Sequence, residues 1–219
     1  MPGSKLNSAP KASILNDFAF ADQPGTDFSD VDRTFLRKLA DQSKKITPVE
    51  WTRILAEHQE FLNTGGGGGL WQTMNVNGVI LGIYAGPSTT RTNTANQDNL
   101  SIQGTHAVLN NRTLEGLPLH GVNLSSANLV GILCQKQDFN QATLGHALVT
   151  DAFLAGTSFR EAKLVGTDFS RSDMRGCDFS GADLTKADFE NVNLTGATFI
   201  GAQLQGARFP GAILTEIKR

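Results

Sequence analysis

Residues 182–200 read ADLTKADFENVNLTGATFI, and a large apolar residue recurs there at every fifth position. The same phase extends in both directions, so that every fifth residue from Leu114 to Leu214 is apolar, 21 positions in succession. Two residues before each of them stands a mostly small side chain, and two residues after it there is often glycine. Neither a helix, with period 3.6, nor a flat strand, with period 2, produces this pattern, whereas a solenoid with short equal sides does.

From residue 139 onward the large residues alternate between Phe (or Val149) and Leu (or Met174). An alternation of ten residues inside a repeat of five means that every second side of the solenoid is alike. Four sides to a turn then predict two aromatic columns on opposite walls, Phe139, Phe159, Phe179, Phe199 and Val149, Phe169, Phe189, Phe209. Small residues at the neighbouring inward positions leave room for the rings, as close packing requires.

The units at 182–186 (ADLTK), 187–191 (ADFEN) and 196–200 (GATFI) resemble the A(D/N)LXX unit of the pentapeptide-repeat family. This resemblance implies a right-handed, four-sided parallel β-helix, in agreement with the four columns. Residues 51–86 also resemble the short helical lead-in found before many such arrays. The predicted fold class is an all-β solenoid: a right-handed four-sided (quadrilateral) parallel β-helix with a short N-terminal helical segment.

Four segments are expected along the chain. Residues 1–28 form an irregular lead-in, and 29–64 a helical segment whose second helix, 47–63, caps the solenoid. That helix starts at Thr47, followed by Pro48 and by Glu50, which is able to bond back to the cap. Residues 65–108 supply a glycine-rich link, a first irregular coil and an insertion loop, and 109–219 the regular array.

Composition excludes several classes of function. The 19 Lys and Arg residues balance 21 Asp and Glu, without the basic excess of a general nucleic-acid binder. No apolar run reaches the length of a membrane span, and the N-terminus lacks the apolar core of a secretory signal, so a cytoplasmic protein is expected. Cys134 and Cys177 both occupy inward positions, which favours reduced, buried thiols over a disulfide or redox pair.

Residues suited to catalysis are scattered. His58, His106, His120 and His146 have no neighbour at a metal-ligand spacing, and there is no nucleophile motif. The five glycines at 65–69 lack the Lys-Ser/Thr of a phosphate-binding loop. The sequence therefore predicts no catalytic, cofactor or metal site, and no enzyme.

The outward position just before each large residue carries two unusual sets of side chains. One set is a ring of acids, which either forms a girdle for a basic partner or is the usual polar residue of the repeat, neutralised by interleaved cations. The other is apolar, and either forms an exposed patch for a partner or dimer, or is covered by residues 1–28 or 87–108. The candidate partner-binding residues are Asp168, Asp173, Asp178, Asp183, Asp188, Leu133, Leu148, Phe153 and Ile213.

These observations favour a non-catalytic scaffold that binds a protein partner through the outer surface of the β-helix, with a homodimer as a further expectation. The resemblance adds an alternative, because some pentapeptide-repeat proteins mimic DNA, bind DNA gyrase and protect it from inhibitors. Such mimics are strongly acidic along the rod, whereas residues 109–219 hold 10 Lys and Arg against 11 Asp and Glu. An enzyme with its site in the first 108 residues is the third class, without a motif to support it.

Overall fold

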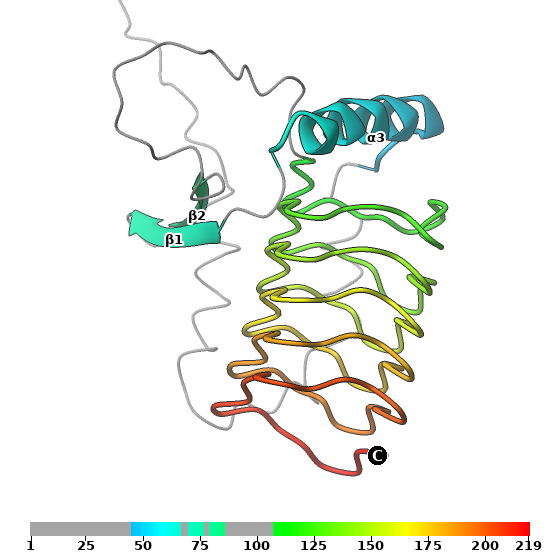
Figure 1. Cartoon of the computed structure of the whole chain (residues 1–219), viewed down its shortest axis with the longest axis vertical. Helices are drawn as coiled ribbons and strands as arrows, with labels where there is room; N and C mark the ends of the chain where they lie inside the picture. The colour runs from blue at the N-terminus through cyan, green and yellow to red at the C-terminus, as the bar shows by residue number, and fades with distance from the viewer. Residues whose placement is uncertain (1–44, 67–69, 77–78, 86–106) are drawn as a thin grey trace, which may run out of the picture.

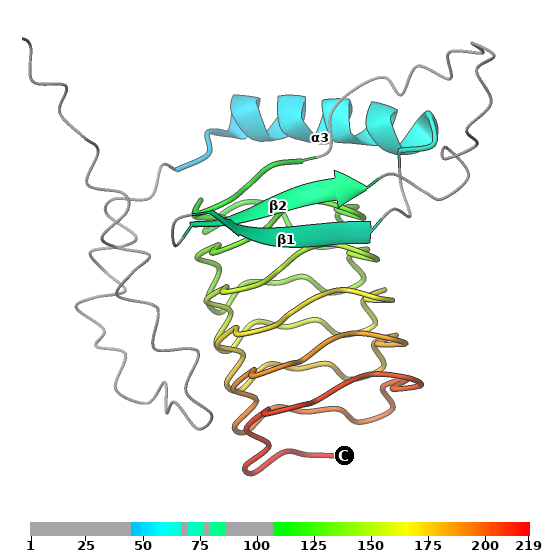
Figure 2. The ribbon, with the colours of Figure 1, turned by 90° about the vertical axis from the view of Figure 1, so that its left-hand side faces the viewer.

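The computed structural model describes residues 45–66, 70–76, 79–85 and 107–219. Its main body is a solenoid that begins at residue 107, with helix α3 (Pro48–Asn63) across one end (Figure 1). Strands β1 (Leu70–Val76) and β2 (Val79–Ala85) form a hairpin beside the first coils (Figure 2). The expected lead-in at 1–28, the part of the expected helical segment before residue 45 and most of the 87–108 insertion lie outside the described residues.

Each turn of the solenoid takes 20 residues. Parallel bridges join residues at that separation along the array, as between Leu133 and Phe153. The Leu148 carbonyl accepts from Leu129 N–H at 2.7 Å, and Leu148 N–H donates to the Ala127 carbonyl at 3.0 Å. The predicted solenoid with 20-residue turns is confirmed. We label its sides by residue: face A contains 127–131, face B 132–136, face C 137–141 and face D 142–146, each with the segments 20 residues before and after it.

The interior of the coil is filled with apolar side chains. Phe139, Phe159 and Phe179 stack with ring centroids 5.3 Å apart, and the opposite column contains the stacked pairs Phe169–Phe189 and Phe189–Phe209. Rings of the two columns meet edge to face, an arrangement that aromatic quadrupoles favour. Both predicted aromatic columns are confirmed.

Polar side chains at the small inward positions are hydrogen-bonded within the wall. Thr157 Oγ1 donates to the Cys134 carbonyl at 2.6 Å, and Cys177 Sγ donates to the Leu154 carbonyl at 3.1 Å. Thr167 and Ser172 donate in the same way to the carbonyl 23 residues earlier. The predicted inward position of both cysteines is confirmed, since both are buried; neither is bonded to the other, and burial raises the pKa of each thiol. A buried thiol held neutral is a poor nucleophile or metal ligand.

Helix α3 covers the first coil. Thr47 caps it by accepting from Glu50 N–H at 3.2 Å, as predicted, while the Glu50 carboxylate accepts from Arg112 Nη2 at 3.0 Å. Trp51 is 2% exposed and belongs to the core of the coil, and His58 is fully buried. The helix thus joins the hydrophobic core by its apolar face and joins the first coil by an ion pair.

The hairpin differs from the expected first irregular coil. Its strands pair antiparallel in register from Leu70↔Ala85 to Val76↔Val79, so this segment is not a turn of the solenoid. The signal was present in the sequence, because Asn77-Gly78 between two apolar runs is typical of a two-residue hairpin turn. Of the helices described, none combines the length and apolarity that crossing a membrane demands.

Candidate interaction surface

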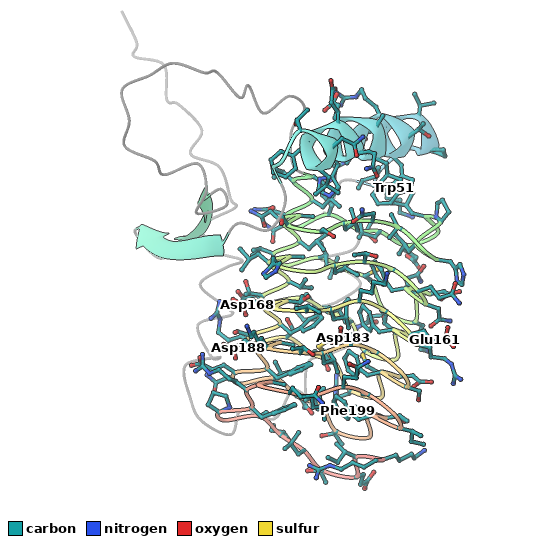
Figure 3. The ribbon with its side chains drawn as sticks, viewed as in Figure 1. Trp51, Glu161, Asp168, Asp183, Asp188 and Phe199 are labelled. Atoms are coloured by element: carbon teal, nitrogen blue, oxygen red, sulfur yellow. The ribbon has the colours of Figure 1, made fainter. Side chains whose placement is uncertain are left out.

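The acidic residues of the predicted ring lie on all four faces of the coil. Figure 3 shows Asp168 and Asp188 on one side, Asp183 toward the viewer and Glu161 at the far edge. By the face labels, Asp173 belongs to face B and Asp178 to face C. The acids therefore encircle the rod and do not form a single acidic patch.

Each of these five carboxylates accepts a hydrogen bond from a backbone N–H of its own turn. The Oδ1 atom accepts from the N–H two residues further on, at 2.9 Å for Asp168 and at 3.0 Å for Asp183. Asn123 and Asn193 make the same bond without a charge, at 3.1 and 3.0 Å. The remaining bonds of this kind are made by Asp173, Asp178 and Asp188. Because a neutral amide serves equally, the acid at this position has a local structural role that does not require charge.

Three of the five acids are also paired with arginine. Asp178 lies 3.1 Å from Arg160 and Asp188 lies 3.0 Å from Arg208, while Asp173 forms a two-bond pair with Arg175 at 2.7 and 2.8 Å. Partial burial opposes ionisation of Asp178, but hydrogen bonds from Ser180 and the Arg160 guanidinium hold the pKa of this carboxyl below its ordinary value. Arg171 pairs with Asp151. These contacts support the second interpretation of the acids, a polar repeat residue neutralised by cations.

The apolar outward residues occupy adjacent faces. Leu133, Phe153 and Ile213 belong to one column of face B, and a parallel bridge joins Leu133 to Phe153, one turn later. Leu148 lies on face A. In this single chain Leu148 is 1% exposed and Phe153 6% exposed, whereas Leu133 and Ile213 are half-buried. For Leu148 and Phe153 this burial favours the second alternative, cover by other parts of the same chain.

Sequence reasoning missed how far this cover extends. On face A, Asn128, Val130, Thr150 and Ser170 are buried although they stand at outward positions. Face B shows the same for Asp173, which is 1% exposed. On faces C and D several outward side chains are exposed, as at Arg160, Lys163 and Lys186, although Ser126 of face D is buried. A period alone gives no signal for this difference, because outward residues of all four faces have the same place in the repeat.

The histidines do not converge on a site. His58 Nδ1 accepts from Ala107 N–H at 3.0 Å, and His120 Nδ1 lies 3.4 Å from the exposed Asp138 carboxylate. His146 is half-buried, and His106 lies outside the described residues. Within the residues that the structure describes, no three His, Cys, Asp or Glu side chains gather where they could hold a metal ion.

The repeat itself can be compared with known proteins. A family model described as pentapeptide repeats (8 copies) matches residues 138–176 and 177–215. Residues 138–215 of this chain therefore match the pentapeptide-repeat family. Pentapeptide-repeat proteins are right-handed four-sided β-helices, and they generally serve as structural or interaction proteins without catalytic activity. A search of curated proteins found no match to the chain.

Solved pentapeptide-repeat structures resemble the array. A pentapeptide-repeat protein from the Arabidopsis thaliana thylakoid lumen is 40% identical over 43% of this chain and 66% of its own, with a TM-score of 0.42. HetL, involved in heterocyst differentiation regulation in the cyanobacterium Nostoc sp. strain PCC 7120, is 29% identical over 50% of this chain and 60% of its own, with a TM-score of 0.40. QnrB1, a plasmid-mediated fluoroquinolone resistance protein, is 21% identical over 51% of this chain and 71% of its own, with a TM-score of 0.32. The chain thus spans slightly less than two thirds of the length of the first two.

Proposed function

We propose that this pentapeptide-repeat protein is a non-catalytic scaffold that binds a protein partner through the outer surface of its β-helix. The right-handed, four-sided form and the cytoplasmic location expected from the sequence are part of the proposal, as is the division into a helical cap at 29–64 and an array at 109–219. The observation that carries it is the filled interior: the large inward side chains from Leu109 to Leu194 are 0–2% exposed. Such a coil offers its outer faces, and not an interior pocket, to another molecule.

Faces C and D supply the accessible part of that surface. Arg160, Glu161, Lys163 and Lys186 are exposed there, with Asp183 half-buried among them. Charges of both signs at the rim of an interface determine orientation and partner choice more than affinity. A partner with a complementary mixed-charge face fits this surface, and the apolar residues Leu133, Leu148, Phe153 and Ile213 would extend the interface if their cover were removed.

The test is affinity capture from the native host with three forms of the full chain. These are the wild type, a face D variant with Lys163→Glu and Lys186→Glu, and a face B variant with Leu133→Asp and Phe153→Asp. We expect the wild type to retain a protein in stoichiometric amount that at least one of the two variants loses. Equal recovery of every protein by all three forms would contradict the proposal, and sedimentation velocity on the same forms would detect a homodimer.

The DNA-mimic alternative is tested by a gyrase supercoiling assay with and without the protein. The pairing of Asp173, Asp178 and Asp188 with arginines leaves little of the continuous negative charge that a mimic of DNA needs. We therefore expect no effect on supercoiling or on its inhibition by quinolones. Protection of gyrase in that assay would favour the alternative over a general scaffold.

A further inference from the structure

The last residue of each five-residue side is a corner of the coil, where the backbone has a positive φ. Glycine occupies many of these corners. Eleven other residues of the described chain also have φ between 53° and 60° there, among them Lys136, Glu161 and Lys186. The backbone of a corner therefore accepts a side chain, and the choice between glycine and a larger residue needs another cause.

A corner side chain lies over the corner of the next coil, 20 residues later. A Cβ atom on Gly166 would lie 2.9 Å from Nδ1 of His146, and one on Gly156 would lie 3.2 Å from Cγ of Lys136. Carbon atoms in favourable contact are about 3.5–4.0 Å apart, so both positions are crowded for anything but glycine. The earlier side chain is likewise the nearest neighbour of the later glycine in Asn111–Gly131, Glu161–Gly181, Lys186–Gly206 and Asn191–Gly211.

A corner glycine that follows another glycine has a different environment. The corner 20 residues before Gly176 is Gly156, and the one before Gly196 is Gly176. A Cβ atom on Gly176 or Gly196 would meet no described atom within 4 Å. The space at a corner is thus determined by the corner residue of the preceding coil.

At two corners a larger residue is followed by a polar partner instead of glycine. Gln141 Nε2 donates to Glu161 Oε2 at 3.1 Å. Arg171 donates from Nε and Nη2 to the Asp151 carboxylate at 2.9 and 2.8 Å. Because Arg171 is directed at the preceding coil in this pair, a side chain can follow it at Asn191.

We propose that these corner pairs determine which coils stack on each other, because a side chain that lies over the following corner requires glycine or a polar partner there. The interior distinguishes neighbouring coils poorly, since Phe159 and Phe179 occupy the same place one turn apart, as do Leu164 and Leu184. Pairing register is weakly specified where successive residues are alike. The corners differ from coil to coil, and so they determine the order of the outer-face residues along the rod, whatever partner those faces bind.

The corner between faces D and A shows how a wrong stack is excluded. In order along the chain, this corner carries Ser126, His146, Gly166, Lys186 and Gly206. His146 meets Gly166 and Lys186 meets Gly206, so that only the small Ser126 comes directly before a larger residue. If one coil were skipped, His146 would meet Lys186, and two long side chains would be crowded into the space of one.

A pair of matched glycines tests the steric requirement. Gly166 and Gly176 have φ of 63° and 66°, so alanine meets the same backbone strain at both corners. Only the new methyl group at Gly166 would meet a side chain. We expect Gly166→Ala to raise the unfolding equilibrium constant, measured with urea, roughly tenfold more than Gly176→Ala does. In the His146→Gly background the two alanine substitutions should have equal effects.

Exchanging residues within a corner tests the pairing order at constant composition. His146→Gly with Gly166→His places histidine over Lys186, whereas Lys136→Gly with Gly156→Lys places lysine over Gly176. We expect the first exchange to lower the urea midpoint and the second to leave it close to that of the wild type.

Three outcomes would overturn the proposal. They are equal midpoints for the two exchanges, equal effects of Gly166→Ala and Gly176→Ala in the wild-type background, and an excess effect of Gly166→Ala that persists with His146→Gly. If the first exchange does not fold, the alanine variants still decide, because each of them adds a single methyl group. Affinity capture tests the proposed function separately, so either proposal can fail alone.

Discussion

The aspartate before each large residue acts mainly as a hydrogen-bond acceptor, and its charge is of less importance. Asp183 accepts a hydrogen bond from the N–H of Thr185, and Asn193 accepts one from the N–H of Thr195. We expect Asp183→Asn to keep the free energy of unfolding within error of the wild type, and Asp183→Ala to lower it by about 1 kcal/mol through the lost hydrogen bond. Urea unfolding of both variants measures this. An equal loss of unfolding free energy in Asp183→Asn and Asp183→Ala would show that the charge matters and the hydrogen-bond acceptor does not.

Asp178 predicts a dependence of stability on pH. Since the folded protein holds the pKa of this carboxyl below its ordinary value, its contribution is fully present above the unfolded value of about 3.9 and is lost as pH falls through the folded value. We expect the wild type to be more stable than Asp178→Asn at pH 7, and the difference to shrink on acidification below about pH 4. Urea midpoints at the two pH values measure it, and a difference that grows in acid would contradict the assignment.

The aromatic columns carry a large share of the packing. Phe159 is 1% exposed and stacks between Phe139 and Phe179. Phe159→Ala should lower the free energy of unfolding by about 3–5 kcal/mol, because the closely packed interior leaves a cavity. Phe209→Ala is the control, since this ring stacks on Phe189 but is only half-buried. Urea unfolding should show the smaller loss for Phe209→Ala.

At the scale of elements, the junction between α3 and the coil depends on His58. Its Nδ1 atom accepts the N–H of Ala107, and both residues are buried. We expect His58→Leu to cost about 1–3 kcal/mol, because it removes the acceptor of a buried N–H. Val49→Thr on the same helix, at a position 82% exposed, should have no measurable effect. Thermal unfolding compares the two, and faster exchange of the Ala107 amide in His58→Leu would locate the damage.

Sequence predicted α3 and the coil well because each of them depends on local signals. Thr47 and Pro48 mark the start of the helix, and the five-residue period marks the coil. Gly78-Val79-Ile80-Leu81 has the form of a repeat and therefore predicts a coil where the structure has a hairpin, although its phase disagrees with that of the array. What covers faces A and B was not predictable, because burial of Leu148 or Phe153 depends on contacts between segments far apart in the chain. The sequence also does not decide the role of the acids, because the hydrogen bonds and ion pairs of each carboxylate depend on the folded coil.

At the scale of the whole molecule, the 20-residue turn predicts which insertions the array tolerates. Duplicating residues 162–181 adds a complete turn, so Phe columns continue and stability should equal or exceed that of the wild type. Duplicating 162–166 adds one side and turns every later coil by a quarter, which places Phe over Leu at the seam. We expect this shorter insertion to lower the urea midpoint, because stacked aromatic pairs and close packing are lost there. A five-residue insertion as stable as the 20-residue one would contradict the column model.

The constant step of 20 residues also bears on how the chain folds. Each new coil pairs with the preceding one across the same short separation in sequence, so the entropic cost of closing every turn is nearly equal. Contact order stays low although the molecule is built from β bridges, which are usually formed between distant residues. Folding can then advance coil by coil from the first turn closed. Helix α3, whose Trp51 packs into the core of the coil, provides a surface on which that first turn can form.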